Sequence, residues 1–192
     1  MGAPLMLTTF DAELLARSFP DGLVAEPVSA MKNVCRYLHQ RQWTDLFDVS
    51  VCEEIVSIPY RLHFSSKLPD SDVLETTHIM GKCLESRSND GFQRQRAAQA
   101  LMQEVQPWSA PFIIALIGEY VVEILRDLHD GLTPEAFSIL ADFVHANPTY
   151  WHITQQRVAS YWNASYRSQF TRTEYAGFKL LNSLNRAVCE KD

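Results

Sequence analysis

The sequence predicts an all-α protein of about eight helices, in which antiparallel helical hairpins form a bundle or a short HEAT-like solenoid. Three observations lead to this prediction. Apolar residues recur at helical spacing along much of the 192-residue chain. Prolines and cap-forming polar residues stand where several of these segments begin. Alternation of apolar and polar residues is nowhere long enough for a sheet, so 59–64 is the only candidate strand.

Three helices are expected before residue 58. The first runs from Asp11 to Phe19, where Pro20-Asp-Gly22 ends it. The second covers 28–41, where apolar residues recur every three or four positions. The third covers about 44–57 and carries apolar residues on one side and acids on the other.

The segment 58–70 is expected to connect these helices to the rest of the chain. Beyond it, helices with short breaks between them are expected at 71–87, 92–105, 111–129, 134–146, 149–170 and 174–189. Short connections favour antiparallel neighbours. We therefore expect a single domain over 1–192, with 1–57 as a potential N-terminal helical subdomain and 71–192 as the main body.

Composition limits the class and the location of the protein. Apolar residues make up 46% and charged residues 21%, as in an ordinary globular domain. The cysteines are scattered without zinc-site spacing, which is typical of reduced thiols in a reducing compartment; they are Cys35, Cys52, Cys83 and Cys189. The sequence has neither a secretory leader pattern at its N-terminus nor a run of about 20 apolar residues. We therefore expect a cytoplasmic protein without a membrane segment.

The charge is unevenly distributed along the chain. Residues 1–149 hold 11 basic and 20 acidic side chains, whereas residues 150–186 have a balance of +4. An acidic body repels nucleic acid and attracts basic partners. We therefore expect a basic protein partner and no nucleic acid, with the C-terminal part as the only region suited to an anion. The oligomeric state is left open.

The window 111–125 is apolar on almost every side, yet it carries Glu119 and Glu123 one helical turn apart. A helix that is apolar all round is buried, and a buried carboxylate needs a partner. The candidate partners are Arg94, Arg96 and Arg157. We predict a buried polar network of these residues; the alternatives are a polar cleft that binds a ligand or partner, and a catalytic acid–base pair.

The C-terminal region is rich in aromatic residues. Four of them are candidates for an exposed binding surface, namely Trp151, Tyr161, Trp162 and Tyr166. The same spacing is typical of a core helix in an aromatic-rich bundle. Aromatic residues interleaved with arginines can also stack on single-stranded nucleic acid.

Several signatures of enzymes are absent from the sequence, including those of phosphate-binding loops, dinucleotide sites, nucleophile elbows and zinc metalloproteases. One Glu-x-x-His pair is present, Glu75 with His78, but helical di-iron sites need two such pairs and two further carboxylates. We therefore predict no metal, no cofactor and no catalytic residues.

Three stretches together resemble a group of uncharacterised bacterial all-helical proteins that share a Gly-Glu-Tyr-Val-Val-Glu-Ile core helix. They are Ile58-Pro-Tyr-Arg61, Gly118-Glu-Tyr-Val-Val-Glu-Ile124 with the preceding Pro111-Phe112, and the region from Asn147-Pro148 to Tyr166. The resemblance covers about 58–180. It implies a bacterial origin and an association with toxin-bearing loci, and it brings no established activity.

Together these observations favour a non-enzymatic protein-binding protein, specifically a cytoplasmic immunity protein that neutralises a basic toxin such as a nuclease. The expected contact acids are Asp45, Asp48, Glu53, Glu54, Asp70 and Asp72. The alternative for these acids is a solvated helix face without a binding role. The alternatives for the protein are a helical scaffold or adaptor that uses the C-terminal aromatic residues, and an enzyme with its site at Glu119 and Glu123.

Overall fold

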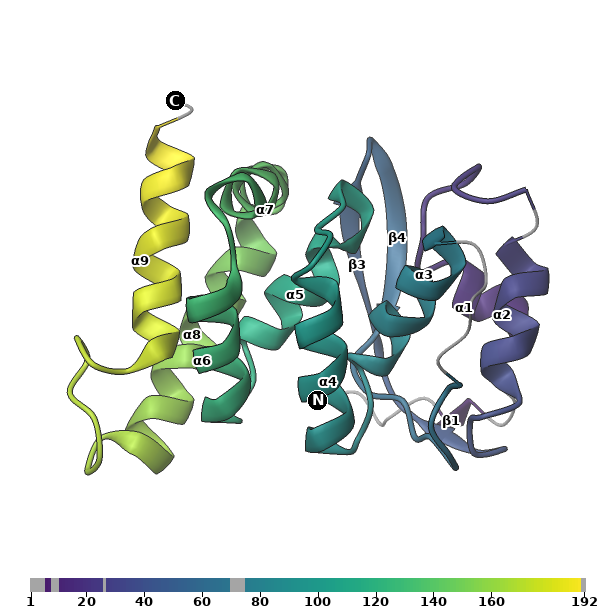
Figure 1. Cartoon of the computed structure of the whole chain (residues 1–192), viewed down its shortest axis with the longest axis horizontal. Coiled ribbons are helices and arrows are strands. Elements are labelled where there is room, and N and C mark those ends of the chain that lie inside the picture. The colour runs from purple at the N-terminus through teal and green to yellow at the C-terminus, as the bar shows by residue number, and fades with distance from the viewer. Residues whose placement is uncertain (1–5, 8–10, 26, 70–74, 191–192) are drawn as a thin grey trace. The chain divides into compact units, whose positions relative to one another are not determined.

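A computed structural model describes residues 6–7, 11–25, 27–69 and 75–190 (Figure 1). The described residues are predominantly helical, in agreement with the sequence prediction, but they also contain two small antiparallel sheets. The chain divides into two compact units, Met1–Ala97 and Ala98–Asp192. The division falls within a helix, α4 (Gly91–Leu101), and not at the predicted connector.

The N-terminal unit mixes helices and strands. Helices α1 and α2 pack against each other in this unit. Its elements are β1 (Met6–Leu7), α1 (Ala12–Ala16), α2 (Pro27–Cys35), β2 (Gln42–Trp43), β3 (Leu46–Val51), β4 (Glu54–Pro59), α3 (Glu75–Glu85) and the first part of α4. The predicted helices at 11–19 and 28–41 are therefore present but shorter than expected.

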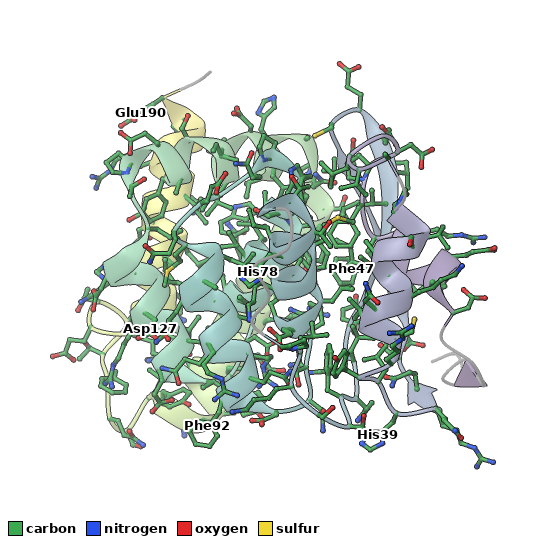
Figure 2. All side chains as sticks on the ribbon, turned by 45° about the vertical axis from the view of Figure 1, so that its right-hand side comes forward. His39, Phe47, His78, Phe92, Asp127 and Glu190 are labelled. Atoms are coloured by element: carbon green, nitrogen blue, oxygen red, sulfur yellow. The ribbon has the colours of Figure 1, made fainter. Side chains whose placement is uncertain are left out.

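The predicted helix over 44–57 is wrong, because β3 and β4 form a hairpin there (Figure 1). The register runs from Leu46 opposite Pro59 to Val51 opposite Glu54. Five apolar side chains face the core of this unit; they are Phe47 (labelled in Figure 2), Val49, Val51, Val56 and Ile58. They alternate with more exposed residues, which is the period of a strand and not of a helix.

The outer edge of β4 is held by the segment that follows α1. The Ser57 amide donates to the Arg17 carbonyl at 2.9 Å, and the Ser18 hydroxyl donates to the Ser57 carbonyl at 2.9 Å. These bonds satisfy the amide and the carbonyl of Ser57 on that side of the strand, which would otherwise need water or another strand.

The turn of the hairpin has an unusual backbone. Cys52 and Glu53 connect the strands, and their φ angles are +51° and +67°. Both values lie in the left-handed region, which glycine and asparagine adopt readily and other residues only at a cost of about 1–2 kcal/mol each. A two-residue hairpin turn of this kind favours Asn-Gly because the backbone twist of the strands requires positive φ at both positions.

The first residues of the predicted connector at 58–70 are held by hydrogen bonds to other parts of the N-terminal unit. The Arg87 guanidinium donates to the carbonyls of Pro59 and Tyr60, at 3.3 and 2.8 Å. The Leu62 amide donates to the Arg87 carbonyl at 2.7 Å, and the Asn89 amide donates to the Leu62 carbonyl at 2.9 Å. The residues after α3 therefore bind the chain just beyond β4, and only tertiary contacts produce this arrangement.

The C-terminal unit is built from helices and short helical turns. Helix α9 packs against α6, α7 and α8, and α5 packs against α6, α7 and α8. The elements are η1 (Pro107–Ser109), α5 (Ala110–Ile117), α6 (Val122–Gly131), α7 (Pro134–Ala146), α8 (Pro148–Tyr161), the π-helical turn η2 (Trp162–Tyr166) and α9 (Ala176–Cys189). The predicted helix at 149–170 therefore ends as an α-helix at Tyr161.

The predicted helix at 111–129 is two helices. Helix α5 ends at Gly118, and the backbone of Val121 is extended where α6 begins. All eight residues of α5 are buried, as the sequence predicts for this window, whereas α6 is amphipathic. The break places Glu119 in the turn between the two helices and Glu123 in the first turn of α6.

The four cysteines are free thiols that differ in exposure. Burial raises the pKa of the Cys83 thiol well above its ordinary value, whereas Cys189 is exposed. Because the thiolate is the reacting form, a maleimide should label Cys189 quickly and Cys83 only after unfolding. Mass spectrometry of peptides after timed labelling checks this prediction, and rapid labelling of Cys83 in the folded protein would contradict it.

Within the described part of the chain, no helix has both the length and the apolar character needed to cross a membrane.

Candidate functional site

The predicted contact acids lie on the β3–β4 hairpin and its flanks. Asp45, Asp48 and Glu53 are exposed, and Glu54 is half-buried. They were predicted on the exposed side of a helix; that placement is wrong, because the residues form strands and a turn. Asp70 and Asp72 fall outside the residues that the structure describes.

Two of these carboxylates are held in place by hydrogen bonds. The Ser57 hydroxyl donates to Asp48 Oδ1 at 2.6 Å across the two strands. The Asp21 amide donates to Glu54 Oε2 at 2.8 Å, which brings a further carboxylate close to the turn. Orienting bonds of this kind reduce the conformational entropy that a side chain loses when it binds a partner.

An exposed isoleucine lies among these acids. Ile55 is 71% exposed, whereas the predicted helix over 44–57 would carry it on its apolar side. It faces Ser50 across the hairpin, so its diagonal neighbours are Asp48 of β3 and Cys52 of the turn. We call Asp48, Glu53 and Ile55 the hairpin face. The alternation of Phe47, Val49 and Val51 is the sequence signal that could have placed these side chains on opposite sides of a strand.

The chemistry of the hairpin face suits binding. Burial and the nearby Glu54 carboxylate raise the pKa of the Cys52 thiol. This thiol is therefore protonated at neutral pH and a poor nucleophile. The remaining groups are carboxylates and an apolar side chain, which can contact a basic, partly apolar surface.

Of the two acids predicted to be buried in the 111–125 window, one is buried and the other is not. Glu119 is buried, at 3% exposure, in the turn after α5, whereas Glu123 is exposed in the first turn of α6. The helix break turns the two side chains into different surroundings, because they no longer lie on one face of one helix.

The candidate partners of Glu119 come from both units of the chain. Arg157 of α8 lies beside the residue before Glu119, because a Cβ on Gly118 would be 3.5 Å from Arg157 Cδ. Arg94 is buried in the N-terminal unit and donates to the carbonyls of Ser88 and Asn89. Arg96 is exposed, so its assignment to a buried network is wrong.

A different buried polar network, which the sequence analysis missed, joins α3 to α4. The Glu85 carboxylate accepts hydrogen bonds from Gln93 Nε2 and Lys82 Nζ, each at 2.9 Å. The Ser88 hydroxyl donates to Gln93 Oε1 at 2.7 Å. Glu85 and Gln93 are both nearly inaccessible, at 4% and 5% exposure. No local pattern marks Glu85 as buried, because the acids of a helix are usually on its solvent side.

Trp151 is not a surface residue, which corrects its prediction as an exposed binding candidate. Its ring is only 7% exposed, and its Nε1–H donates to Asn185 Oδ1 of α9 at 3.0 Å. The spacing that suggested a binding surface is therefore the spacing of a core helix, which was the alternative interpretation.

The other three aromatic candidates, Tyr161, Trp162 and Tyr166, are half-buried, and each contacts other residues of the C-terminal unit. Trp162 Nε1 donates to the Phe170 carbonyl at 2.9 Å. The Tyr166 hydroxyl donates to the Tyr120 carbonyl at 2.6 Å, and the Tyr161 ring lies 5.9 Å from the Tyr120 ring. These contacts support Tyr120, which is 51% exposed.

Comparisons with protein-family models, with curated proteins and with solved structures find no match for this chain. Its function is therefore inferred from the geometry and chemistry of its own residues.

Proposed function

We propose that this protein is a non-enzymatic protein-binding protein that captures a basic protein through the hairpin face. The observation that carries the proposal is the combination of acids around an exposed Ile55 at a turn with two left-handed residues. Protein interfaces commonly have an apolar centre inside a polar rim. Left-handed residues other than glycine are enriched at functional sites, where the strain is offset by function.

The class of partner follows from charge. The carboxylates of Asp48 and Glu53 project from the hairpin, and the chain carries a net charge of −6. Acidic surfaces steer basic partners toward them and raise the association rate, mainly at low ionic strength. A cytoplasmic immunity protein that blocks a basic toxin such as a nuclease fits this charge pattern. The resemblance to the bacterial group, which implies an association with toxin-bearing loci, supports the same proposal.

Capture of the partner tests the proposal directly. Tagged protein should retain one stoichiometric basic protein from lysate of its native cell at low salt. The partner should be released at about 0.5 M salt, because screening then limits the attraction between charges to a few ångströms. Mass spectrometry identifies the partner, and a purified partner allows neutralisation of its toxicity to be measured. Retention that ignores ionic strength would contradict the proposal.

Replacement of Glu53 by glycine should raise stability and weaken binding. Glycine adopts the positive φ without strain, so the free energy of unfolding should rise by about 0.5–1 kcal/mol. Loss of the carboxylate from the hairpin face should weaken partner binding about tenfold, which corresponds to about 1.4 kcal/mol. Chemical denaturation measures the first effect, and titration calorimetry with the captured partner measures the second.

Two control variants separate backbone from charge. Glu53→Asn also tolerates the left-handed backbone but keeps a polar side chain, so its binding should fall as much as that of Glu53→Gly. Glu190→Gln removes an exposed acid at the end of the C-terminal unit and should bind like the unchanged protein. Equal weakening by Glu190→Gln would show that only net charge matters and would contradict a defined hairpin site.

A second candidate function, a helical scaffold or adaptor, is favoured by Tyr120. This ring is exposed between α5 and α6 and is supported by Tyr161 and Tyr166. Supported aromatic side chains are frequent anchors of protein interfaces. In this case we infer that the C-terminal helices stack as helical hairpins in a bundle or short HEAT-like solenoid. Tyr120→Ala would then abolish capture of the partner, whereas Glu53→Gly would leave it unchanged.

A further inference from the structure

A cavity of about 250 Å³ lies within the N-terminal unit between α2 and α3. Part of its wall is apolar, formed by Ala30 and Val34 of α2 and by Leu68 and Pro69. Besides Gly81, the remaining wall carries the polar side chains of Asn33, Arg36, Tyr37, Thr77, His78, Lys82 and Glu85. None of these residues belongs to the hairpin face.

The polar side of the cavity is anchored by Glu85. Its carboxylate is almost entirely buried and accepts three hydrogen bonds, from Lys82, Gln93 and the Leu68 amide. The Lys82–Glu85 pair, at 2.9 Å, neutralises the one acid among the described residues of this wall. Gln93 is itself held by Ser88, so the carboxylate has a defined orientation.

The side chains that remain on the wall carry positive charge or donate hydrogen bonds. Among the described residues, Arg36, Tyr37 and His78 form no side-chain hydrogen bond or ion pair with the protein. His78 comes from α3 (Figure 2), and Arg36 and Tyr37 directly follow α2. With Glu85 neutralised, a guanidinium, an imidazole and a phenol border an apolar space.

We infer that this cavity binds a small organic monocarboxylate with an apolar body. Arg36 offers its guanidinium to the carboxylate, and Tyr37 and His78 add hydrogen-bond donors. The apolar body lies against Val34 and Leu68. One guanidinium matches a single negative charge better than a phosphate, which carries more charge and usually binds several cations or backbone amides.

The size of the cavity limits the ligand. An apolar cavity of about 150 Å³ holds benzene, so about 250 Å³ holds a ligand of roughly ten non-hydrogen atoms. Phenylacetate, benzoate and hexanoate lie in this range. The inference does not depend on the proposed partner binding, because the cavity and the hairpin face use different residues.

Ligand-observed and protein-observed NMR titrations test the inference on the full chain. The probes are phenylacetate, benzoate and hexanoate, each compared with its neutral primary amide. At least one carboxylate should bind with a Kd below about 1 mM, and its amide should bind at least about tenfold more weakly, as expected when a charged hydrogen bond is lost. Absence of binding by all three acids at about 10 mM would overturn the inference.

Matched variants locate the binding. Arg36→Gln should weaken carboxylate binding at least about tenfold, while Arg41→Gln, which removes an exposed arginine outside the cavity wall, should leave it unchanged. Gly81→Leu places a side chain in the cavity and should abolish binding of acids and amides alike. Circular dichroism and thermal unfolding confirm that each variant is folded. Equal effects of the two arginine variants, or tight binding to the Gly81→Leu protein, would overturn the inference.

Failure of this test leaves the proposed function untouched. Partner capture is measured on the hairpin face with Glu53→Gly, and Glu53 does not line the cavity. Arg36→Gln should therefore retain the captured partner. A protein that binds phenylacetate but no partner would support the cavity and contradict the hairpin proposal, and the reverse result would do the opposite.

Discussion

Replacing Trp151 by alanine should lower the free energy of unfolding by about 3–5 kcal/mol, which would unfold a marginally stable protein. The ring is buried in α8 against the C-terminal helices, and its removal leaves a cavity and takes from Asn185 Oδ1 one of its two hydrogen bonds, the other coming from Gln155. Urea denaturation followed by far-UV circular dichroism measures the loss. The result bears on function, because a loss of binding by this variant would report unfolding and not a broken contact.

Two further substitutions serve as controls for this measurement. Trp151→Phe keeps most of the apolar contact but loses the hydrogen bond to Asn185, so it should be milder, at about 1–2 kcal/mol. Ile153→Ala, in the same helix but 37% exposed, should change stability by less than about 1 kcal/mol. A Trp151→Ala protein as stable as Ile153→Ala would show that the ring is not part of the core.

Replacing Gly177 by alanine should also destabilise the protein, by about 1–3 kcal/mol. The added Cβ would lie 2.7 Å from Tyr175 Cε1 and 2.9 Å from Val158 Cγ1. The Tyr175 ring cannot move aside easily, because it stacks on Tyr166 at 5.4 Å between centroids and meets Phe178 edge-on at 6.0 Å. Crowding therefore outweighs the about 1 kcal/mol that alanine gains over glycine in a helix.

The same substitution at Gly81 should have the opposite sign. There the added Cβ would meet only Leu68 Cδ1, at an ordinary 3.5 Å. Gly81→Ala in α3 should therefore raise stability by about 0.5–1 kcal/mol, since alanine is the better helix former. Thermal and urea unfolding of both variants decide the matter. Destabilisation by Gly81→Ala, or stabilisation by Gly177→Ala, would contradict the packing at that glycine.

Local signals predicted the elements whose ends are set by local chemistry. Helix α7 spans Pro134–Ala146, as the sequence predicts, because Thr133 caps it and Pro134 suits its first turn. The Thr133 hydroxyl oxygen accepts a hydrogen bond from the Ala136 amide at 3.2 Å. The burial of α5 was also predictable, since its residues are apolar on every side.

Four apolar residues of the hairpin are also compatible with a helix. Leu46, Phe47, Val51 and Ile55 fit a helical pattern, and the acids between them fit its exposed side. Burial of Val49, Val56 and Ile58 against exposure of Ile55 decides for strands, and this choice depends on the neighbouring elements. The four contact acids that lie in the described residues are exposed or half-buried, and their mutual placement comes from the strand register.

The cavity residues illustrate what sequence reasoning leaves open. Arg36 is far in sequence from His78 and Glu85, which share helix α3, and the sequence marks His78 only through its Glu-x-x-His spacing with Glu75. The packing of α2 and α3 brings their side chains around one space, and the hydrogen bond from Gln93 explains how Glu85 can be buried. Neither relation leaves a trace in local periodicity.

The sequence alone determined the predominantly helical character, the caps of α7, the burial of α5 and the acidic balance of the chain. These properties depend on residues that are neighbours along the chain or on simple sums over it. Tertiary structure alone decided the hairpin, the break between Glu119 and Glu123, the burial of Trp151 and the cavity. Those features depend on which distant surfaces pack together, because burial and pairing free energies override weak local preferences of about 1 kcal/mol or less per residue.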